Sequence, residues 1–356
     1  MDYLLLVINP GSTSTKVALF LNDKLIQETT LRHEAEKLQE FKTIIDQLEF
    51  RRQVILDFLI DHKYQLNQID VFVGRGGMLK PLKNGGAYLV TEQMLDDLRT
   101  CKYGSHASNL GALLASSFAK PFNRPAYIVD PVVIDEFEDI SRVSGQKLIE
   151  RKSIFHALNQ KATAKRHAKS MGKNYEDMNL IVVHLGGGIS VGLHKKGRVI
   201  DVNNALGGDG PFSPERTGTI PTYPLVDLCF SGEYTEKEIK KLLVGKGGLV
   251  SYLGTHDGRE IEARIANGDK EAQFYFEAMG YTVVKSIGAM YFACKGKVDA
   301  VLITGGLAYS KYFTDYLKSY TDKIVPTYIY PGEDEMGALA EGTLRVLKKE
   351  EKLQAY

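Results

Sequence analysis

Two apolar runs near the N-terminus are separated by a short polar turn. Leu4 to Ile8 is apolar, Gly11 to Thr15 is small and hydroxylated, and Val17 to Phe20 is apolar again. This pattern predicts two strands joined by a tight turn. The N–H and O–H groups of such a turn could bind the oxygen atoms of a phosphate, and Lys16 adds a nearby positive charge. The motifs of a P-loop and of a dinucleotide site are missing after this strand. Taken alone, the pattern also fits an ordinary exposed hairpin.

The same pattern returns in the second half of the chain. Leu180 to Leu185 is apolar, three glycines follow at 186–188, and Ile189 to Leu193 is apolar again. Superposing Gly11 on Gly186 aligns Asn9 with His184. The repeat indicates two related halves, and it predicts two phosphate-binding turns that face each other across a cleft.

Strand and helix patterns alternate through both halves, which predicts an α/β fold with helices covering the sheets. The expected strands are 3–9, 16–21, 69–73, 126–130, 180–184, 189–194, 198–202 and 298–303, and helical patterns lie near 34–62, 92–100, 106–119, 235–243, 258–266, 269–293 and 335–350.

Two segments have the character of domain crossovers. Asp130 and Pro131 end a strand where the first set of elements closes, and Glu333-Asp334-Glu335 precedes the last helical pattern. We therefore expect one domain of residues 1–130 and 335–356 and a second of residues 131–334. A hinge at these crossovers would allow closure around a nucleotide and exclude water from a transferred phosphoryl group.

The composition narrows the choice of partners and compartment. The chain has 356 residues with 44% hydrophobic content, enough for sizeable cores, and its 45 basic and 44 acidic residues give a net charge of +1. This balance favours neither nucleic acid nor an anionic membrane as a partner. No apolar segment approaches the ~18 residues of a membrane span, and the start lacks a basic leader region, so we expect a cytoplasmic protein.

Cysteine usage and one basic segment carry less information about function. Cys101, Cys229 and Cys294 have no metal-binding spacing, which predicts a reducing compartment and no metal cluster. The basic segment Lys161 to Lys169 repeats at helical spacing, and a solvated helix face is favoured over a binding patch.

Two arginines lie in glycine-rich or proline-rich loops, where side chains are presented to clefts. Arg75 precedes Gly76 and Gly77, and Arg216 follows Pro214. The forked donors of a guanidinium match a carboxylate or the oxygens of a transferring phosphoryl group. Taken alone, each arginine is more often a surface salt-bridge partner.

Acidic and histidine side chains supply further candidates. Asp130 and Glu335, at the two crossovers, could organise Mg²⁺, although Glu335 could instead cap a helix. His156 and His184 could donate to phosphoryl oxygens, although a single histidine is more often structural. The strand 298–303 runs into Gly305-Gly306, where a flat adenosine could approach the backbone.

Together these motifs resemble the acetokinase family, the acetate kinase branch of the superfamily that includes sugar kinases, Hsp70 and actin. The likeness covers nearly the whole chain. It rests on Ile8 to Lys16 as a first phosphate motif, Val183 to Gly188 as a second, and Ile303 to Leu307 as an adenosine motif, with further matches at 74–77 and 330–336.

The resemblance implies two duplicated RNase H-like domains of the actin-like ATPase fold, with a nucleotide cleft between them. It further implies reversible, ATP-dependent phosphorylation of a short-chain carboxylate with Mg²⁺, and the details of the motifs favour butyrate. A branched-chain or propionate kinase on the same fold, or a non-catalytic nucleotide-dependent switch, is the alternative. The family also forms dimers or larger assemblies, so a homo-oligomer is expected.

The site residues that follow from the motifs and the resemblance fall into three groups. The expected catalytic residues are Arg75, Asp130, His156, Arg216 and Glu335; the expected ATP/ADP-binding residues are Asn9, Ser12, Ser14, Lys16, His184, Gly186, Gly187, Gly188, Gly305 and Gly306; and the expected Mg²⁺ ligands are Asp130 and Glu335.

This chain also departs from the acetate kinase pattern. Arg75 matches the first family arginine by position only, Gly187 replaces an asparagine, and His106 lies within one residue of an earlier active-site histidine. Gly74 stands where acetate kinases have a bulky apolar residue. We expect this glycine to make room for a four-carbon acyl chain.

Overall fold

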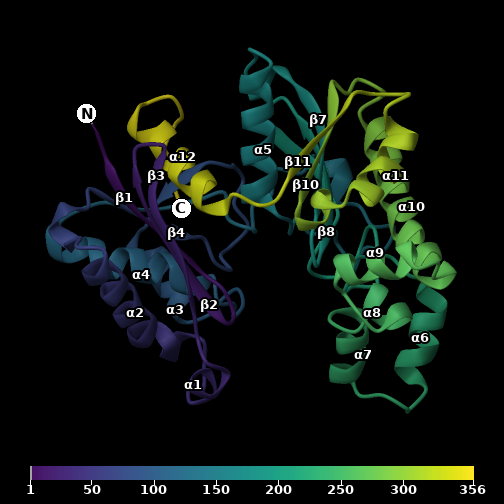
Figure 1. Ribbon diagram of the computed structural model, residues 1–356, viewed down its shortest axis with the longest axis horizontal. Coiled ribbons are helices and arrows are strands. Elements are labelled where there is room, and N and C mark those ends of the chain that lie inside the picture. Colours follow the sequence, from purple (N-terminus) through teal and green to yellow (C-terminus); the bar gives the residue numbers. More distant parts are fainter. Residues whose placement is uncertain (1) are drawn as a thin grey trace. The chain divides into compact units, whose positions relative to one another are not determined.

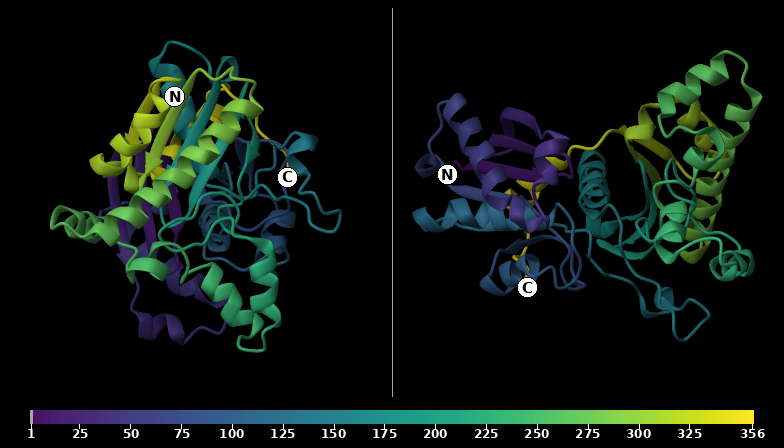
Figure 2. Two further views of the ribbon diagram at one scale, coloured as in Figure 1. Left: turned by 90° about the vertical axis from the view of Figure 1, so that its right-hand side faces the viewer. Right: turned by 90° about the horizontal axis from the view of Figure 1, so that it is seen from below.

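The computed structural model describes residues 2–356, and its elements divide into two compact units. Unit 1 contains the residues up to Ile134 together with Asp334–Tyr356, and unit 2 is Asp135–Glu333. The limits expected from the sequence, at residues 130 and 335, stay a prediction as domain boundaries. Figures 1 and 2 show a mixed α/β architecture with one large sheet in each unit, which confirms the expected fold class.

Unit 1 is built on a six-stranded sheet of order β3-β2-β1-β4-β6-β5. Its strands are β1 (Leu4–Pro10), β2 (Ser14–Leu21), β3 (Lys24–Arg32), β4 (Val71–Arg75), β5 (Ala87–Leu89) and β6 (Ala126–Val129), and its α-helices are α1 (Ala35–Gln39), α2 (Leu48–Asp61), α3 (Glu92–Arg99), α4 (Asn109–Ala119) and α12 (Glu335–Leu347). Helices α4 and α12 both pack on β1, β4 and β6, and Figure 1 shows them on opposite sides of the sheet.

Unit 2 is built on a five-stranded sheet of order β11-β10-β7-β8-β9. Its strands are β7 (Asn179–Leu185), β8 (Ile189–Lys195), β9 (Arg198–Val202), β10 (Ala300–Gly305) and β11 (Thr327–Pro331), and its α-helices are α5 (Ala157–Ser170), α6 (Thr222–Phe230), α7 (Glu236–Leu243), α8 (Leu249–Leu253), α9 (Gly258–Ala266), α10 (Lys270–Ala293) and α11 (Lys311–Thr321).

The strand orders of the two sheets agree with the duplication that the sequence predicts. In each unit, three strands form an antiparallel meander, and the first strand of the meander then pairs in parallel with the next strand of the sheet. The antiparallel pairs β1–β2 and β7–β8 are therefore equivalent, and each has its glycine-containing turn at the same end of the sheet. Strands β3, β5 and β11 are not among the strands that the sequence predicts.

Side-chain alternation decides which helix covers which residues of the central strands. In β7, Ile181, Val183 and Leu185 join the core formed with α10, whereas Leu180 and Val182 pack with α5. His184 therefore lies on the α5 face, because alternate residues of a strand point to the same side.

Among residues 2–356, no helix combines the length and the apolar character that crossing a membrane requires. The cytoplasmic location stays a prediction.

Candidate active site

A cluster of three polar side chains in unit 1 forms where β1 and β4 end. The two strands are parallel neighbours with Ile8 opposite Gly74, so Asn9 and Arg75 come next to each other at the sheet edge. Asn9 Nδ2 donates to Glu335 Oε2 over 2.7 Å, and Arg75 Nη1 donates to Glu335 Oε1. The structure thus brings together three predicted site residues, and Glu335 is 260 residues from Arg75 and 326 from Asn9 in the sequence.

Two neighbouring acidic residues at the start of α12 have different roles. Asp334 is the cap: its side chain accepts a hydrogen bond of 2.9 Å from the N–H of Gly337. Glu335 lies in the first helical turn, where a carboxylate is stabilised by the helix dipole, and both of its oxygens are bonded to Asn9 and Arg75. The alternative interpretation of Glu335 as the helix cap is therefore wrong.

A pocket of about 280 Å³ lies over this cluster. It is lined by Asn9, Pro10, Gly11, Ser14, Lys16, Thr30, Arg75, His106, Ser108 and Glu335. Burial and the charge of Arg75 lower the pKa of His106 below its usual value. The His106 ring is fixed by Ser108, whose Oγ lies 2.8 Å from Nδ1. His106 thus lines the same pocket as Arg75. The sequence had matched His106 only to within one residue of an active-site histidine of the family.

The hydroxyl residues of the first turn have different positions. Ser14 lines the pocket, whereas Ser12 is exposed and is bonded through its backbone carbonyl. Lys16 also lines the pocket, and its Nζ lies 2.9 Å from Glu28 Oε1 on β3. The positive charge of Lys16 is therefore shared with a neighbouring strand.

Arg51, on α2, lies beneath the first turn and was not predicted as a site residue. It is fully buried, and all five of its N–H groups donate to neutral oxygens. Nη1 donates to Ser14 O (2.8 Å) and Thr15 Oγ1 (3.0 Å), Nη2 donates to Ser12 O (3.2 Å), and both Nε and Nη2 donate to Gln47 Oε1. Burial lowers the pKa of Arg51 to about 10.

Arg51 therefore fixes the carbonyls of the first turn on the side away from the pocket. It also places a positive charge under the site, and within residues 2–356 this charge has no carboxylate partner. A sequence signal for this residue was absent, because one arginine in a charged helical pattern is usually exposed.

Asp130 follows β6 in a left-handed backbone conformation, with φ of 41°. It is buried, and its Oδ1 accepts a 2.6 Å hydrogen bond from the N–H of Gly86. Asp130 thus directly follows a strand, as the sequence predicted, and that strand lies between β4 and β5 in the sheet.

Gly74 has a different role from the one expected. A Cβ on Gly74 would collide with the backbone of Gly111 in α4, and a Cβ on Gly111 would collide with the backbone of Arg75. Gly74 allows the close packing of β4 against α4 and does not line the pocket. The expectation that it enlarges an acyl pocket is wrong, because a side chain here would displace a helix.

The second turn, in unit 2, is formed by backbone atoms and an inserted arginine. The N–H of Gly186 donates to Gly188 O over 3.1 Å, and Ser213 Oγ donates to Gly187 O over 2.6 Å. A Cβ on Gly188 would collide with Nη1 of Arg216, which donates to Ala205 O. Burial lowers the pKa of Arg216, and the charge of Glu215 opposes this shift.

The two predicted histidines of unit 2 are stacked on each other. The rings of His156 and His184 are nearly parallel, with centroids 3.7 Å apart. His184 Nδ1 lies 2.9 Å from Asn159 Oδ1, and its Nε2 lies 3.1 Å from Glu333 Oε1. His156, the residue before α5, is bonded through Nδ1 to Ser190 Oγ at 2.9 Å.

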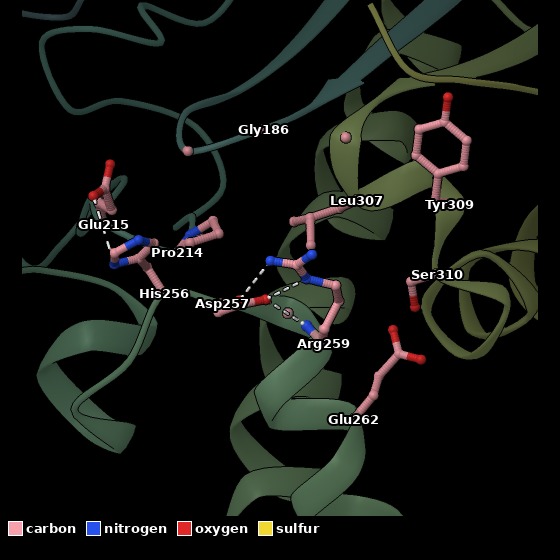
Figure 3. Close-up of a pocket in the computed structure, with 13 residues that line it drawn as sticks. Gly186, Pro214, Glu215, His256, Asp257, Arg259, Glu262, Leu307, Tyr309 and Ser310 are labelled. Atoms are coloured by element: carbon pink, nitrogen blue, oxygen red, sulfur yellow. Dashed lines mark hydrogen bonds and ion pairs between the residues drawn. The ribbon is translucent and has the colours of Figure 1, made fainter. Parts of the chain in front are cut away.

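A larger pocket of about 650 Å³ lies beside the second turn (Figure 3). It is lined by Gly186, Gly187, Pro214, Glu215, His256, Asp257, Gly258, Arg259, Glu262, Gly306, Leu307, Tyr309 and Ser310. The predicted glycines 186, 187 and 306 thus meet residues from the start of α9. Gly305 is not one of the lining residues; its φ is +93°, and a Cβ there would collide with the Leu185 carbonyl.

The residues around α9 were missed by the sequence analysis. Asp257 caps α9 through a 2.9 Å bond from the N–H of Arg259, and it also pairs with the Arg259 guanidinium. These bonds hold the pKa of Asp257 at about 2. An Asp before a helical pattern is a capping signal, but a local signal does not reveal that this end of the helix faces a pocket.

The basic segment on α5 also differs from its predicted role. Lys161 is buried, and its Nζ lies 2.9 Å and 3.0 Å from the two carboxylate oxygens of Glu136. For Lys161 the interpretation as a solvated face is wrong, because β9 and the segment around residue 136 cover this side of the helix.

The donor set fits a magnesium ion only in part. Among residues 2–356, no group of three or more His, Cys, Asp or Glu side chains could hold a metal by itself. Mg²⁺ usually takes one or two carboxylates and completes its shell with phosphates and water. Asp130 and Glu335 are suited to that limited role, although Glu335 is already bonded to Asn9 and Arg75.

Solved structures share this fold. The structure of Porphyromonas gingivalis acetate kinase matches with a TM-score of 0.79 and 20% identity, covering 97% of this chain and 100% of that one. Entamoeba histolytica acetate kinase matches with a TM-score of 0.75 and 17% identity, covering 96% and 98%. The fold is thus that of acetate kinases.

Sequence comparison defines the family. Residues 139–312 match the model of the acetokinase family. The chain is 54% identical to butyrate kinase 2 of Clostridium acetobutylicum and 52% identical to a probable butyrate kinase of Clostridium botulinum, in each case over 100% of both chains. The chain belongs to the acetokinase family, and it is a kinase.

Proposed function

We propose that this kinase catalyses the reversible transfer of a phosphoryl group from ATP to butyrate, which gives butyryl phosphate and ADP. The observation that carries the proposal is the 54% identity, over the full length of both chains, to a butyrate kinase. A propionate kinase from Francisella tularensis is only 19% identical, so propionate is not favoured as the preferred substrate.

The chemistry of the two pockets supports this reaction. A carboxylate is already an anion and a nucleophile, so the reaction needs positioning and charge neutralisation and no general base. We propose that Arg75 binds the carboxylate in the unit 1 pocket and that the unit 2 pocket binds the nucleotide. Arg216 and His156 would stabilise the oxygens of the transferring phosphoryl group.

The remaining predicted residues have supporting roles in this proposal. Asn9 and Ser14 would contact phosphate oxygens at the first turn, and the glycines at 186–188 would do so at the second. Mg²⁺, when bound, would neutralise nucleotide phosphate charge, with Asp130 or Glu335 as its protein carboxylate.

We also propose that the protein is a homo-oligomer. Helix α6 supports this proposal: its sequence is TYPLVDLCF, yet none of its residues is buried, and Tyr223 and Phe230 are each 85% exposed. An apolar helix that the described residues leave largely exposed is typical of an interaction surface. Size-exclusion chromatography with light scattering would measure the assembly.

The substrate proposal is tested by trapping acyl phosphate with hydroxylamine. The assay contains ATP and carboxylates from formate to hexanoate, each with and without Mg²⁺. We expect the highest kcat/KM for butyrate and a requirement for Mg²⁺. A maximum at propionate or at a branched acid would overturn the assignment of butyrate, and no trapped product with any carboxylate would overturn the reaction itself.

The role of Arg216 is tested separately. In Arg216→Ala, kcat should fall by about 100-fold or more, because a partly buried donor to the transferring phosphoryl group is lost. Circular dichroism should show an unchanged fold. An unaffected kcat would remove Arg216 from the mechanism.

A further inference from the structure

A chain of buried hydrogen bonds leads from the interior of unit 2 to His156. We propose that Tyr175, His194, Gln160 and Ser190 fix the His156 ring with its proton on Nε2, so that this nitrogen acts as the hydrogen-bond donor. The inference rests on the proposed function, in which His156 donates to phosphoryl oxygens. The four residues act through His156 and are positioning residues.

The orientation of the Gln160 amide is set by a backbone carbonyl. Gln160 Nε2 lies 3.1 Å from Ser190 O and 2.7 Å from Ser190 Oγ. A carbonyl oxygen can only accept, so the amide nitrogen of Gln160 must face it. The amide oxygen, Oε1, then points the other way, toward His194 Nε2 at 2.9 Å.

This orientation defines the protonation of His194. Because Gln160 Oε1 accepts, His194 Nε2 must carry a proton. His194 is fully buried, and burial keeps its pKa well below the usual value, so the ring is neutral. Its Nδ1 is therefore an acceptor, and the Tyr175 hydroxyl, 2.7 Å away, donates to it.

The same argument applies at the His156 end of the hydrogen-bond chain. Ser190 Oγ accepts one amide proton from Gln160, and the other group it contacts within residues 2–356 is His156 Nδ1, at 2.9 Å. Ser190 is fully buried, so its own hydroxyl proton needs an acceptor, and Nδ1 is the one at hand. With Nδ1 accepting, a neutral His156 carries its proton on Nε2.

The local sequence leaves space for the side chains of this hydrogen-bond chain. Residues 190, 192 and 194 of β8 alternate onto the face that α5 covers, and a Cβ on Gly192 would collide with Gln160 Oε1. Gln160 also lies one turn after His156, whose backbone carbonyl accepts the Gln160 N–H at 2.9 Å. Ser190, Gln160 and His194 are all fully buried, which keeps competing water away from the chain.

The test combines histidine ¹⁵N NMR with kinetics on the full chain. The His156 signals are assigned by their loss in His156→Asn. In the wild type we expect an unprotonated Nδ1 and a protonated Nε2. In Ser190→Ala and Gln160→Met the two tautomers should mix, and kcat should fall about 10- to 100-fold, while KM for ATP and for the carboxylate stays within about twofold.

Matched variants control for structural damage. Ser286→Ala removes a serine hydroxyl of the same unit that bonds only within α10, and it should change neither the His156 signals nor kcat. Ser190→Cys keeps a weak donor at the same position and should restore part of the kcat lost in Ser190→Ala. Thermal unfolding verifies that each variant is folded at the assay temperature.

The outcomes distinguish the proposed hydrogen-bond chain from the proposed catalytic role of His156. A wild-type His156 protonated on Nδ1 would overturn the proposal, and so would a tautomer that is unchanged in both Ser190→Ala and Gln160→Met. If the tautomers mix in these variants while kcat is unaffected, the chain of bonds is supported and the proposed role of His156 in catalysis fails.

Discussion

The two glycine-containing turns have equivalent places in their sheets but different chemistry. The first, at residues 11–13, lies over the buried guanidinium of Arg51, which bonds to the turn from below. The second, at 186–188, has no side chains, and the guanidinium of Arg216 occupies the space where a Cβ of Gly188 would be. One turn is supported by a cation underneath, and the other leaves space for a cation beside it.

This difference shows that two turns with the same backbone arrangement need not have the same charged groups around them. A hairpin turn exposes N–H groups in both units, but the positive charge that an anion needs comes from a different element each time. In unit 1 it comes from helix α2, and in unit 2 it comes from the loop after β9. The comparison can be tested by removing each cation or the space that it needs.

The largest effect is expected from Arg51→Met. The variant removes the donor to Ser12 O and one of the two partners of both Ser14 O and Thr15 Oγ1, and it should reduce the free energy of unfolding of unit 1 by about 3–5 kcal/mol. Urea unfolding followed by circular dichroism measures this change.

Arg52→Met is the matched control for Arg51→Met. Arg52 is the next residue of α2, and its Nη1 lies 3.9 Å from Glu49, at a partly exposed position. This variant should cost less than about 1 kcal/mol. Equal losses for the two variants would show that Arg51 has no special role beneath the turn.

Gly188→Ala is expected to give the next largest effect. The added methyl group would displace the Arg216 guanidinium, and kcat should fall by about 100-fold. In Gly11→Ala, at the equivalent turn, the nearest atom to the new Cβ is 3.5 Å away, an ordinary contact, so kcat should change less than about threefold. Steady-state kinetics on both variants tests the contrast, which equal losses would refute.

A smaller, pH-dependent effect is expected from His33, whose Nε2 lies 2.9 Å from Thr15 Oγ1 in the first turn. Burial, together with the charge of Arg51, lowers the His33 pKa to about 4. The unfolded chain binds a proton near the usual pKa of 6.5 and the folded one does not, so stability falls as the pH drops from about 6.5 toward 4.

The measurement compares the wild type with His33→Gln, which cannot titrate in this range. Between pH 7 and pH 5 the wild type should lose about 2 kcal/mol more stability than the variant. Other histidines with lowered pKa values contribute equally to both proteins and cancel in the difference. Parallel pH profiles would show that His33 does not destabilise the first turn in acid.

The sequence alone determined most of the strands, the two glycine-containing turns and their duplication. These features depend on the alternation of neighbouring residues and on glycines at turns, and both are local properties. The predicted residues Asn9, Arg75 and Glu335 do converge, since they lie at the ends of elements that any sheet of this order brings together. Their roles in binding and catalysis stay predictions.

Only the tertiary structure decided which charged residues are buried and what a glycine contacts. Arg51 and Lys161 occur in segments with the charge pattern of exposed helices, yet both are buried, because strands and loops far away in the sequence cover them. Gly74 packs against α4, which a family comparison of side-chain size could not show. Burial depends on long-range packing, and a residue's neighbours in sequence carry little information about it.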